Sequence, residues 1–185
     1  MTCTSFTAPL PFSLFFALYP PQPLAWEIVS RGTRLKRAHH LGGRLIDPPR
    51  IHLTLASVYD CTEPWRDHFD RAIRVGHAMR QQSFPLALEW TQSFAHDGHY
   101  QPFVMCGEDG TRCLKHFRKA LAEEMRKVGF KVSPGFTPHV TLLWADRRVD
   151  EHPMLPVGWT ATDFVLIESI RGRSRHTELG RWCLH

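Results

Sequence analysis

The chain of 185 residues lacks the sequence patterns that mark several large functional classes. It has no G-x-x-x-x-G-K-[ST] phosphate loop and no Rossmann glycine pattern, so nothing indicates ATP or NAD binding. Its five cysteines are scattered, and no two are spaced as C-x-x-C, which argues against a zinc ribbon or a redox pair. We therefore expect no cofactor and no metal, and the cysteine usage favours a reduced, cytoplasmic setting.

Charge is also missing from the beginning of the chain, where no charged side chain precedes Glu27. A secretory signal would begin with a basic segment, and prolines interrupt the region around the apolar residues FSLFFAL at 12–18. This apolar run is too short to cross a membrane. We expect a disordered lead over residues 1–11, a first core strand directly after it, and no membrane partner.

The overall composition is that of an ordinary globular domain, with 43% hydrophobic and 22% charged residues. The formal net charge is +5 and the sequence pI is about 9.2. This balance favours an anionic ligand, for which RNA is a natural candidate, although a basic surface that only serves solubility would give the same values. At this length we expect a single domain over residues 12–185, present as a monomer.

Hydrophobic periodicity predicts an α+β or mixed α/β protein built on antiparallel sheet. One helix is expected from about Pro23 to Arg37, a second from Trp65 after a start at Thr62 or Glu63-Pro64, and a third from Leu114 until Gly129. Alternating or continuous apolar runs predict strands at 13–19, 51–58, 84–92, 101–107, 139–145, 164–170 and 178–184.

One four-residue phrase occurs twice, as His52-Leu53-Thr54-Leu55 and as His139-Val140-Thr141-Leu142. Each copy lies in a run of strand character, where side chains alternate between the two faces of a sheet. In each copy the histidine and the threonine therefore share one face. The two histidines lie about half the chain apart, and a helical pattern precedes each copy, which indicates two related lobes.

A single copy of this phrase reads most simply as the solvent face of a half-buried strand. Two copies favour a site, because imidazole titrates near neutrality and a pair can act as acid and base in one step. The threonine hydroxyls can donate hydrogen bonds to a phosphate oxygen. Such a set suits a phosphodiester with an internal leaving group, for example a 2′,3′-cyclic phosphate.

Two other clusters have simpler explanations. The segment His96-Asp97-Gly98-His99 lacks further ligands at metal-site spacing and reads as a polar loop. A basic stretch before the first motif either follows an RNA backbone near the site or forms a solvated helix face; it comprises Arg31, Arg34, Lys36, Arg37, Arg44 and Arg50.

The doubled His-x-Thr-Leu phrase resembles the signature of the 2H (two-histidine) phosphoesterase superfamily. The opening SLFFALYPP, then PPRIHLTL and FTPHVTLLWA, resemble its branch of RNA 2′,3′-cyclic phosphodiesterases, also called 2′-5′ RNA ligases. The resemblance covers roughly residues 12 to 184. It implies an α+β fold of two pseudo-symmetric lobes of antiparallel sheet, with helices outside and a central cleft. It also implies that His52 and Thr54 form one catalytic half, and His139 and Thr141 the other.

The sequence departs from that branch at one position. Many members have an arginine five residues after the second histidine, whereas this chain has Trp144. Arg147, Arg148 or an arginine at 171 or 173 can replace the missing charge, and Trp144 either stacks on a base or lies in the core or at its rim.

The resemblance implies metal-independent hydrolysis of the 2′,3′-cyclic phosphate ends of RNA, or of small cyclic nucleotides, to a 2′-phosphate. His139 is expected to activate water, and His52 to protonate the departing 3′ oxygen. Two alternatives stay open. The same site can serve a 2′-5′ phosphodiesterase or an RNA ligase, and the fold can serve as an RNA-binding module without turnover.

Overall fold

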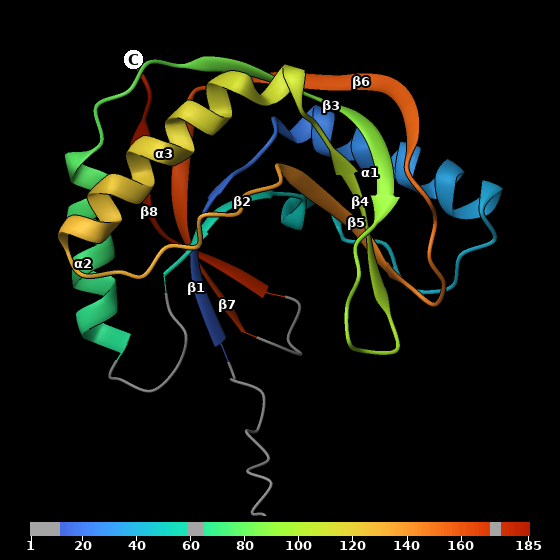
Figure 1. Ribbon diagram of the computed structural model, residues 1–185, viewed down its shortest axis with the longest axis horizontal. Helices are drawn as coiled ribbons and strands as arrows, with labels where there is room; N and C mark the ends of the chain where they lie inside the picture. Colours follow the sequence, from blue (N-terminus) through green and yellow to red (C-terminus); the bar gives the residue numbers. More distant parts are fainter. Residues whose placement is uncertain (1–11, 59–64, 171–174) are drawn as a thin grey trace, which may run out of the picture.

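The computed structural model in Figure 1 describes residues 12–58, 65–170 and 175–185. The α-helices are α1 (Gln22–Ala38), α2 (Trp65–Ala78) and α3 (Arg112–Lys127), and two 3₁₀ helices are η1 (Pro48–Arg50) and η2 (Asp109–Thr111). The strands are β1 (Phe12–Leu18), β2 (Leu53–Ser57), β3 (Phe84–Ser93), β4 (Gln101–Cys106), β5 (His139–Ala145), β6 (His152–Ala161), β7 (Asp163–Ile170) and β8 (Arg175–Cys183). The lead at 1–11 and the helix start at 62–64 lie outside the described residues.

All the strands form one antiparallel sheet in the order β6-β3-β4-β5-β2-β1-β7-β8. Its two halves have the same plan. Each contains a strand-helix-strand unit, β1-α1-β2 or β4-α3-β5, whose second strand lies at the centre of the sheet and whose first strand lies directly beside it. α2 packs on β7, β8 and α3, and α1 packs on β5, outside the sheet (Figure 1). The expected α+β fold of antiparallel sheet with outer helices is confirmed.

The helical patterns place apolar side chains in a common core. α3 buries Leu114, Phe117, Leu121 and Met125, at the spacing that the sequence predicted. The helix ends before Gly129, whose φ of 87° suits a residue without a side chain. α1 also forms in full, and no helix in the described ranges is long and apolar enough to cross a membrane.

Gly32 explains why α1 tolerates a glycine in its interior. It is buried, and a Cβ atom built there would lie 3.1 Å from Leu45 and 3.4 Å from Leu142. The missing side chain therefore lets α1 approach β5, the strand that carries the second motif. Gly32 is therefore a packing feature of α1, although glycine lowers helix propensity.

β6 is a strand that the sequence analysis missed. It contains Pro153, Pro156 and Gly158, which read as turn or loop residues. β6 lies at the edge of the sheet and pairs only with β3 among the described strands, so prolines there interrupt no second ladder. The last strand is also longer than predicted, because β8 begins at Arg175 rather than at residue 178.

β1 is apolar on both faces, as its sequence predicts for a central strand. Leu14, Phe16 and Leu18 belong to the main core. Phe15 and Ala17 point the other way and form a second, small cluster with residues of β7. This second cluster gives the opposite face of the sheet an apolar floor beside the first motif.

The packing of α2 on β8 yields a stability prediction. A Cβ atom at Gly76 would overlap the indole ring of Trp182, which stacks on Phe164 at 5.2 Å between centroids. Glycine to alanine in a helix normally stabilises by about 1 kcal/mol. We expect Gly76→Ala instead to lower the free energy of unfolding by about 1–3 kcal/mol, as overpacking does, measured by urea denaturation.

The matched control for this change is Gly135→Ala, where the added Cβ atom would lie 4.0 Å from the nearest heavy atom, Ser133 Oγ. We expect this variant to keep the unfolding midpoint of the unchanged protein. A Gly76→Ala protein as stable as this control would contradict the rigid packing of Trp182.

Candidate active site

The two motif strands, β2 and β5, lie side by side in the centre of the sheet. Their antiparallel register pairs Leu53 with Val140, the residue between histidine and threonine in each motif. Both are fully buried in the core. Because strand side chains alternate, the histidines and threonines project from the other face, and an approximate twofold axis passes between the two motifs.

A pocket of about 500 Å³ opens on this face of the sheet. It is lined by Ser13, Phe15, Ile46, Arg50, His52, Thr54, Ser57, Thr141, Trp144, Ser169 and His176. Three of the four predicted site residues are therefore in its wall. The fourth, His139, lies beside it, near enough that its charge helps to lower the pKa of His52.

Both motif histidines are anchored by the same hydrogen bond. Nδ1 of His52 lies 2.7 Å from the carbonyl oxygen of Arg50, and Nδ1 of His139 lies 2.7 Å from that of Thr137. A carbonyl oxygen only accepts, so each Nδ1 carries the proton and donates. Nε2 of each ring is then left to accept a proton or, in the cationic form, to donate one.

The environment keeps both imidazoles neutral in the free protein. Burial lowers the pKa of His52 to about 4, against the opposing effect of its bond to the Arg50 carbonyl, and the charges of Arg50 and His139 lower it further. Burial also lowers the pKa of His139, again against the bond to its carbonyl partner. Two neutral rings with free Nε2 atoms are two available bases, and either becomes an acid only when an anion nearby favours its cationic form.

A third histidine, His176 of β8, lies against the first motif. Its ring centroid is 5.0 Å from that of His52, and its Nδ1 is 2.7 Å from the Tyr19 hydroxyl. Burial, His52 and Arg50 together lower the pKa of His176 to about 4. Phe15 packs on both rings, with its centroid 5.2 Å from His52 and 5.7 Å from His176.

His176 gave no signal in the sequence. It reaches the pocket because β8 pairs with β7 and β7 with β1, which aligns His176 with Ser169 and Ser169 with Ser13. These three polar residues form a row across three strands. Such a row depends on strand order and register, and neither is visible in a single sequence.

One arginine of the basic stretch before the first motif lies in the pocket wall. Arg50, in η1, lines the pocket, and its buried Nε has no hydrogen-bond partner within the described part of the chain. Trp144 also lines the pocket, with 42% of its surface exposed. Arg147 and Arg148 do not line it, and Arg147 pairs with Asp146 at 3.8 Å. The candidate at 171 lies outside the described residues.

The histidines at 96 and 99 lie in the β3–β4 connection. His96 Nδ1 accepts a hydrogen bond from the backbone N–H of Gly98, and its ring meets Trp144 edge-on at 5.2 Å. Across the described ranges, no group of three or more His, Cys, Asp or Glu is placed to hold a metal ion.

Comparison with known proteins gives consistent matches along the chain. Residues 21–173 match the family profile of the 2′-5′ RNA ligase superfamily. The RNA 2′,3′-cyclic phosphodiesterase of Escherichia coli K12 is 29% identical over 94% of this chain and 97% of that protein. A crystal structure of E. coli LigT complexed with 3′-AMP has a TM-score of 0.69 at 27% identity, over 95% and 99% of the two chains. TT0787 of Thermus thermophilus shares the fold, with a TM-score of 0.73 at 19% identity over 93% and 97%.

The effect of the Arg50 charge on the neighbouring imidazoles can be tested by replacing this residue. Replacing Arg50 with glutamine removes a cation that lowers the pKa of both His52 and His176, so both values should rise toward 6.5. The pKa of His139, which is set by burial and by the bond to the Thr137 carbonyl, should change less. The measurement is an NMR titration of the ring protons.

Arg44→Gln is the control, because Arg44 is exposed, pairs with Asp47 and does not line the pocket. We expect it to leave all three histidine pKa values in place. Equal shifts in the two variants would mean that net charge, rather than the position of Arg50, sets these values.

Proposed function

Because the chain belongs to the 2′-5′ RNA ligase superfamily, we propose that it hydrolyses 2′,3′-cyclic phosphate ends of RNA or of small nucleotides to a 2′-phosphate. The family match confirms the resemblance that the two motifs indicated. The family and the E. coli relative also support the enzyme class, a hydrolase acting on phosphoric diester bonds. The acid–base pair, the lack of a metal requirement and the site of cleavage are our inferences.

One observation carries the proposal: two imidazoles, each anchored through Nδ1, lie close together, His52 in the wall of the pocket and His139 beside it. Nε2 of His139 takes a proton from water as the water oxygen attacks phosphorus. The bond from phosphorus to the 3′ oxygen breaks, and the cationic His52 gives its Nε2 proton to that oxygen. A 2′-phosphate and a 3′-hydroxyl result, and the two rings exchange protonation states.

The substrate itself supplies the charge that the acid needs. In the free protein both pKa values lie below the usual histidine value, so neither ring starts as the cation near neutral pH. A phosphodiester anion in the pocket favours protonation of the nearer ring. Arg50 attracts the same anion, and its charge opposes protonation of an empty site. Binding and protonation of the acid are thereby coupled.

The remaining pocket residues suit the other parts of a nucleotide. The hydroxyls of Thr54 and Thr141 can donate to the nonbridging oxygens, where charge develops during attack. Trp144, exposed at the rim, offers a face on which a base can stack.

The family description supports a second candidate, the joining of a 2′,3′-cyclic end to a 5′-hydroxyl. A 5′-hydroxyl would replace water, and the same two imidazoles would move the same protons, because the leaving group is unchanged. A 2′-5′ phosphodiesterase uses the reverse steps. A binding module without turnover is less favoured, since both histidines and both threonines are present.

The proposed reaction is tested with a short RNA that carries a 2′,3′-cyclic phosphate, incubated in EDTA. We expect a 2′-phosphate product that a 3′-specific phosphatase does not cleave. An added 5′-hydroxyl oligonucleotide would reveal the ligase reaction as a longer product. Activity lost in EDTA and restored by a divalent ion would contradict the metal-free mechanism. A 3′-phosphate product would contradict the role of His52.

The acid–base pair predicts a non-additive set of variants. His52→Ala and His139→Ala should each lower kcat by about 10²–10⁴, because each removes a proton donor or acceptor. The double variant should lose far less than the product of the two losses, because the pair acts as a unit. Thr54→Ala and Thr141→Ala should have smaller effects. The measurement is single-turnover hydrolysis of the cyclic substrate.

His116→Ala is the matched control, since His116 is an exposed residue of α3 whose Nδ1 also bonds a backbone carbonyl, at 3.1 Å. It should keep full activity. A fully active His139→Ala enzyme would refute the pair.

A further inference from the structure

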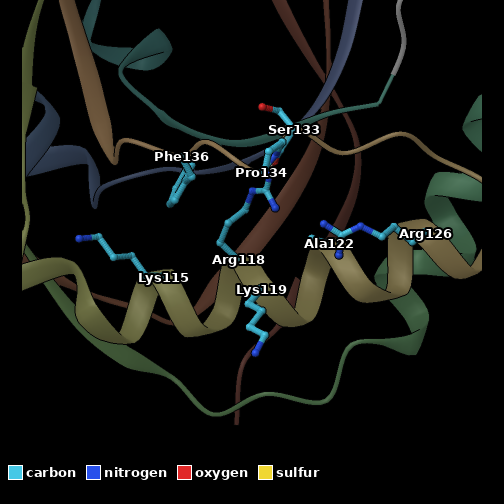
Figure 2. Close-up of a pocket in the computed structure, with 8 residues that line it drawn as sticks. All are labelled: Lys115, Arg118, Lys119, Ala122, Arg126, Ser133, Pro134 and Phe136. Atoms are coloured by element: carbon cyan, nitrogen blue, oxygen red, sulfur yellow. Dashed lines mark hydrogen bonds between the residues drawn. The ribbon is translucent and has the colours of Figure 1, made fainter.

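A second pocket lies away from the active site, between α3 and the loop at 130–138 that leads into β5. Its volume is about 260 Å³. It is lined by Lys115, Arg118, Lys119, Ala122, Arg126, Ser133, Pro134 and Phe136 (Figure 2). It shares no lining residue with the active-site pocket. Nothing in the proposed reaction uses it, yet four of its lining residues are cationic.

Arg118 is the central feature of this pocket. It is 8% exposed, and in Figure 2 it extends from α3 toward Pro134. One Nη atom donates to the carbonyl of Ser133 at 3.2 Å, and the guanidinium lies 5.4 Å from the centroid of the Phe136 ring. Its Nε is buried without a hydrogen-bond partner, and no carboxylate pairs with the guanidinium in the described ranges.

An unpaired buried cation is costly, because burial removes water without supplying an opposite charge. The cost is visible in Arg118, whose pKa is lowered by burial first and by the charge of Arg126 second. An anion in the pocket would offset both effects and would give the free Nε a partner.

The other cations of α3 show a consistent division. Arg112 pairs with Asp109 and Lys127 pairs with Glu124, and neither lines the pocket. Lys115 and Arg126 line the pocket, and neither has a carboxylate partner among the residues described. Lys119 also lines it, although its ammonium points away from the loop in Figure 2. The unpaired positive charge of this helix is thus concentrated around Arg118.

We propose that this pocket is a second phosphate-binding site, held by Arg118 and completed by Lys115 and Arg126. A guanidinium fork with a free Nε matches the oxygens of a phosphate group. The volume admits a phosphate with a small substituent. The phosphate comes from one of two sources, the body of an RNA whose end lies in the active site, or a free phosphate compound.

The position of the pocket connects it to catalysis. Ser133 and Phe136, which Arg118 holds, precede Thr137, whose carbonyl anchors His139. His139 comes six positions after Ser133, so the two lie no more than about 22 Å apart along extended chain. A bound phosphate therefore contacts the loop that orients the proposed base.

Binding is tested first, on the whole protein and without any reaction. Inorganic phosphate is titrated into ¹⁵N-labelled protein at constant ionic strength, and the amide shifts of Ser133, Gly135 and Phe136 are followed. We expect saturating shifts that disappear in the double variant Lys115→Gln/Arg126→Gln. Lys127→Gln, which removes an equal charge from the same helix outside the pocket, should retain them. Loop amides that do not respond to phosphate or to RNA would overturn the proposal, as would equal responses in all three proteins.

Kinetic measurements distinguish the two sources of the bound phosphate, RNA and a free phosphate compound. This experiment rests on the proposed function. If RNA is the source, the double variant should raise KM about three- to tenfold for an oligonucleotide with a cyclic end, as expected for two exposed ion pairs. A cyclic mononucleotide should be unaffected. If a free phosphate compound is the source, the double variant should keep the oligonucleotide KM of the unchanged protein, although phosphate shifts the loop amides of the unchanged protein and not those of the variant. A protein that binds phosphate in the loop but hydrolyses neither substrate would contradict the proposed function alone.

Discussion

The antiparallel contact of β2 with β5 is the constraint on which the site depends. Pairing Leu53 with Val140 directs the apolar residue of each motif into the core and leaves both histidines and both threonines on the other face. A slip of one residue in either strand would bury one histidine and expose an apolar side chain. The burial of two aliphatic residues thus fixes the register, and the register places the reactive groups. The packing of the core and the geometry of the site therefore depend on the same strand register.

The parts of this arrangement that follow local rules could be predicted from the sequence. The strand at 139–145 and the apolar stripe of α3 follow directly from periodicity. β6 could not, because its prolines are tolerated only at a sheet edge, and edge position is a property of the whole sheet. His176 was missed for a related reason, because it reaches the pocket through strand order, which brings distant segments together. Arg50 stood in the sequence as one of six basic residues ahead of the first motif, and only the placement of η1 singles it out.

Electrostatics give the site a resting state different from the one that two histidines alone suggest. A pair of exposed imidazoles would titrate near 6.5, whereas burial, together with the charges of Arg50 and His139, lowers the pKa of His52 to about 4. The described wall of the pocket therefore places neutral rings beside the charged Arg50. Such a site favours anions over cations, and in the proposed mechanism its proton donor forms only when an anion is bound. The proposed reaction therefore depends on the negative charge of the bound ligand.

The two motifs are anchored alike but supported differently. The carbonyl group that anchors His52 belongs to Arg50, in η1. Backbone hydrogen bonds close this turn, from Arg50 N to Asp47 O at 2.8 Å and from Ile51 N to Pro48 O at 3.1 Å. The carbonyl group that anchors His139 belongs to Thr137, in the loop at 130–138. The side chain of Arg118 donates a hydrogen bond to Ser133 of the same loop. The first support is local, and the second reaches across to α3, where Arg118 has no carboxylate partner among the described residues. An approximate twofold axis therefore relates the two imidazoles but not their supports, and the His139 side is the one on which a distant ligand can act.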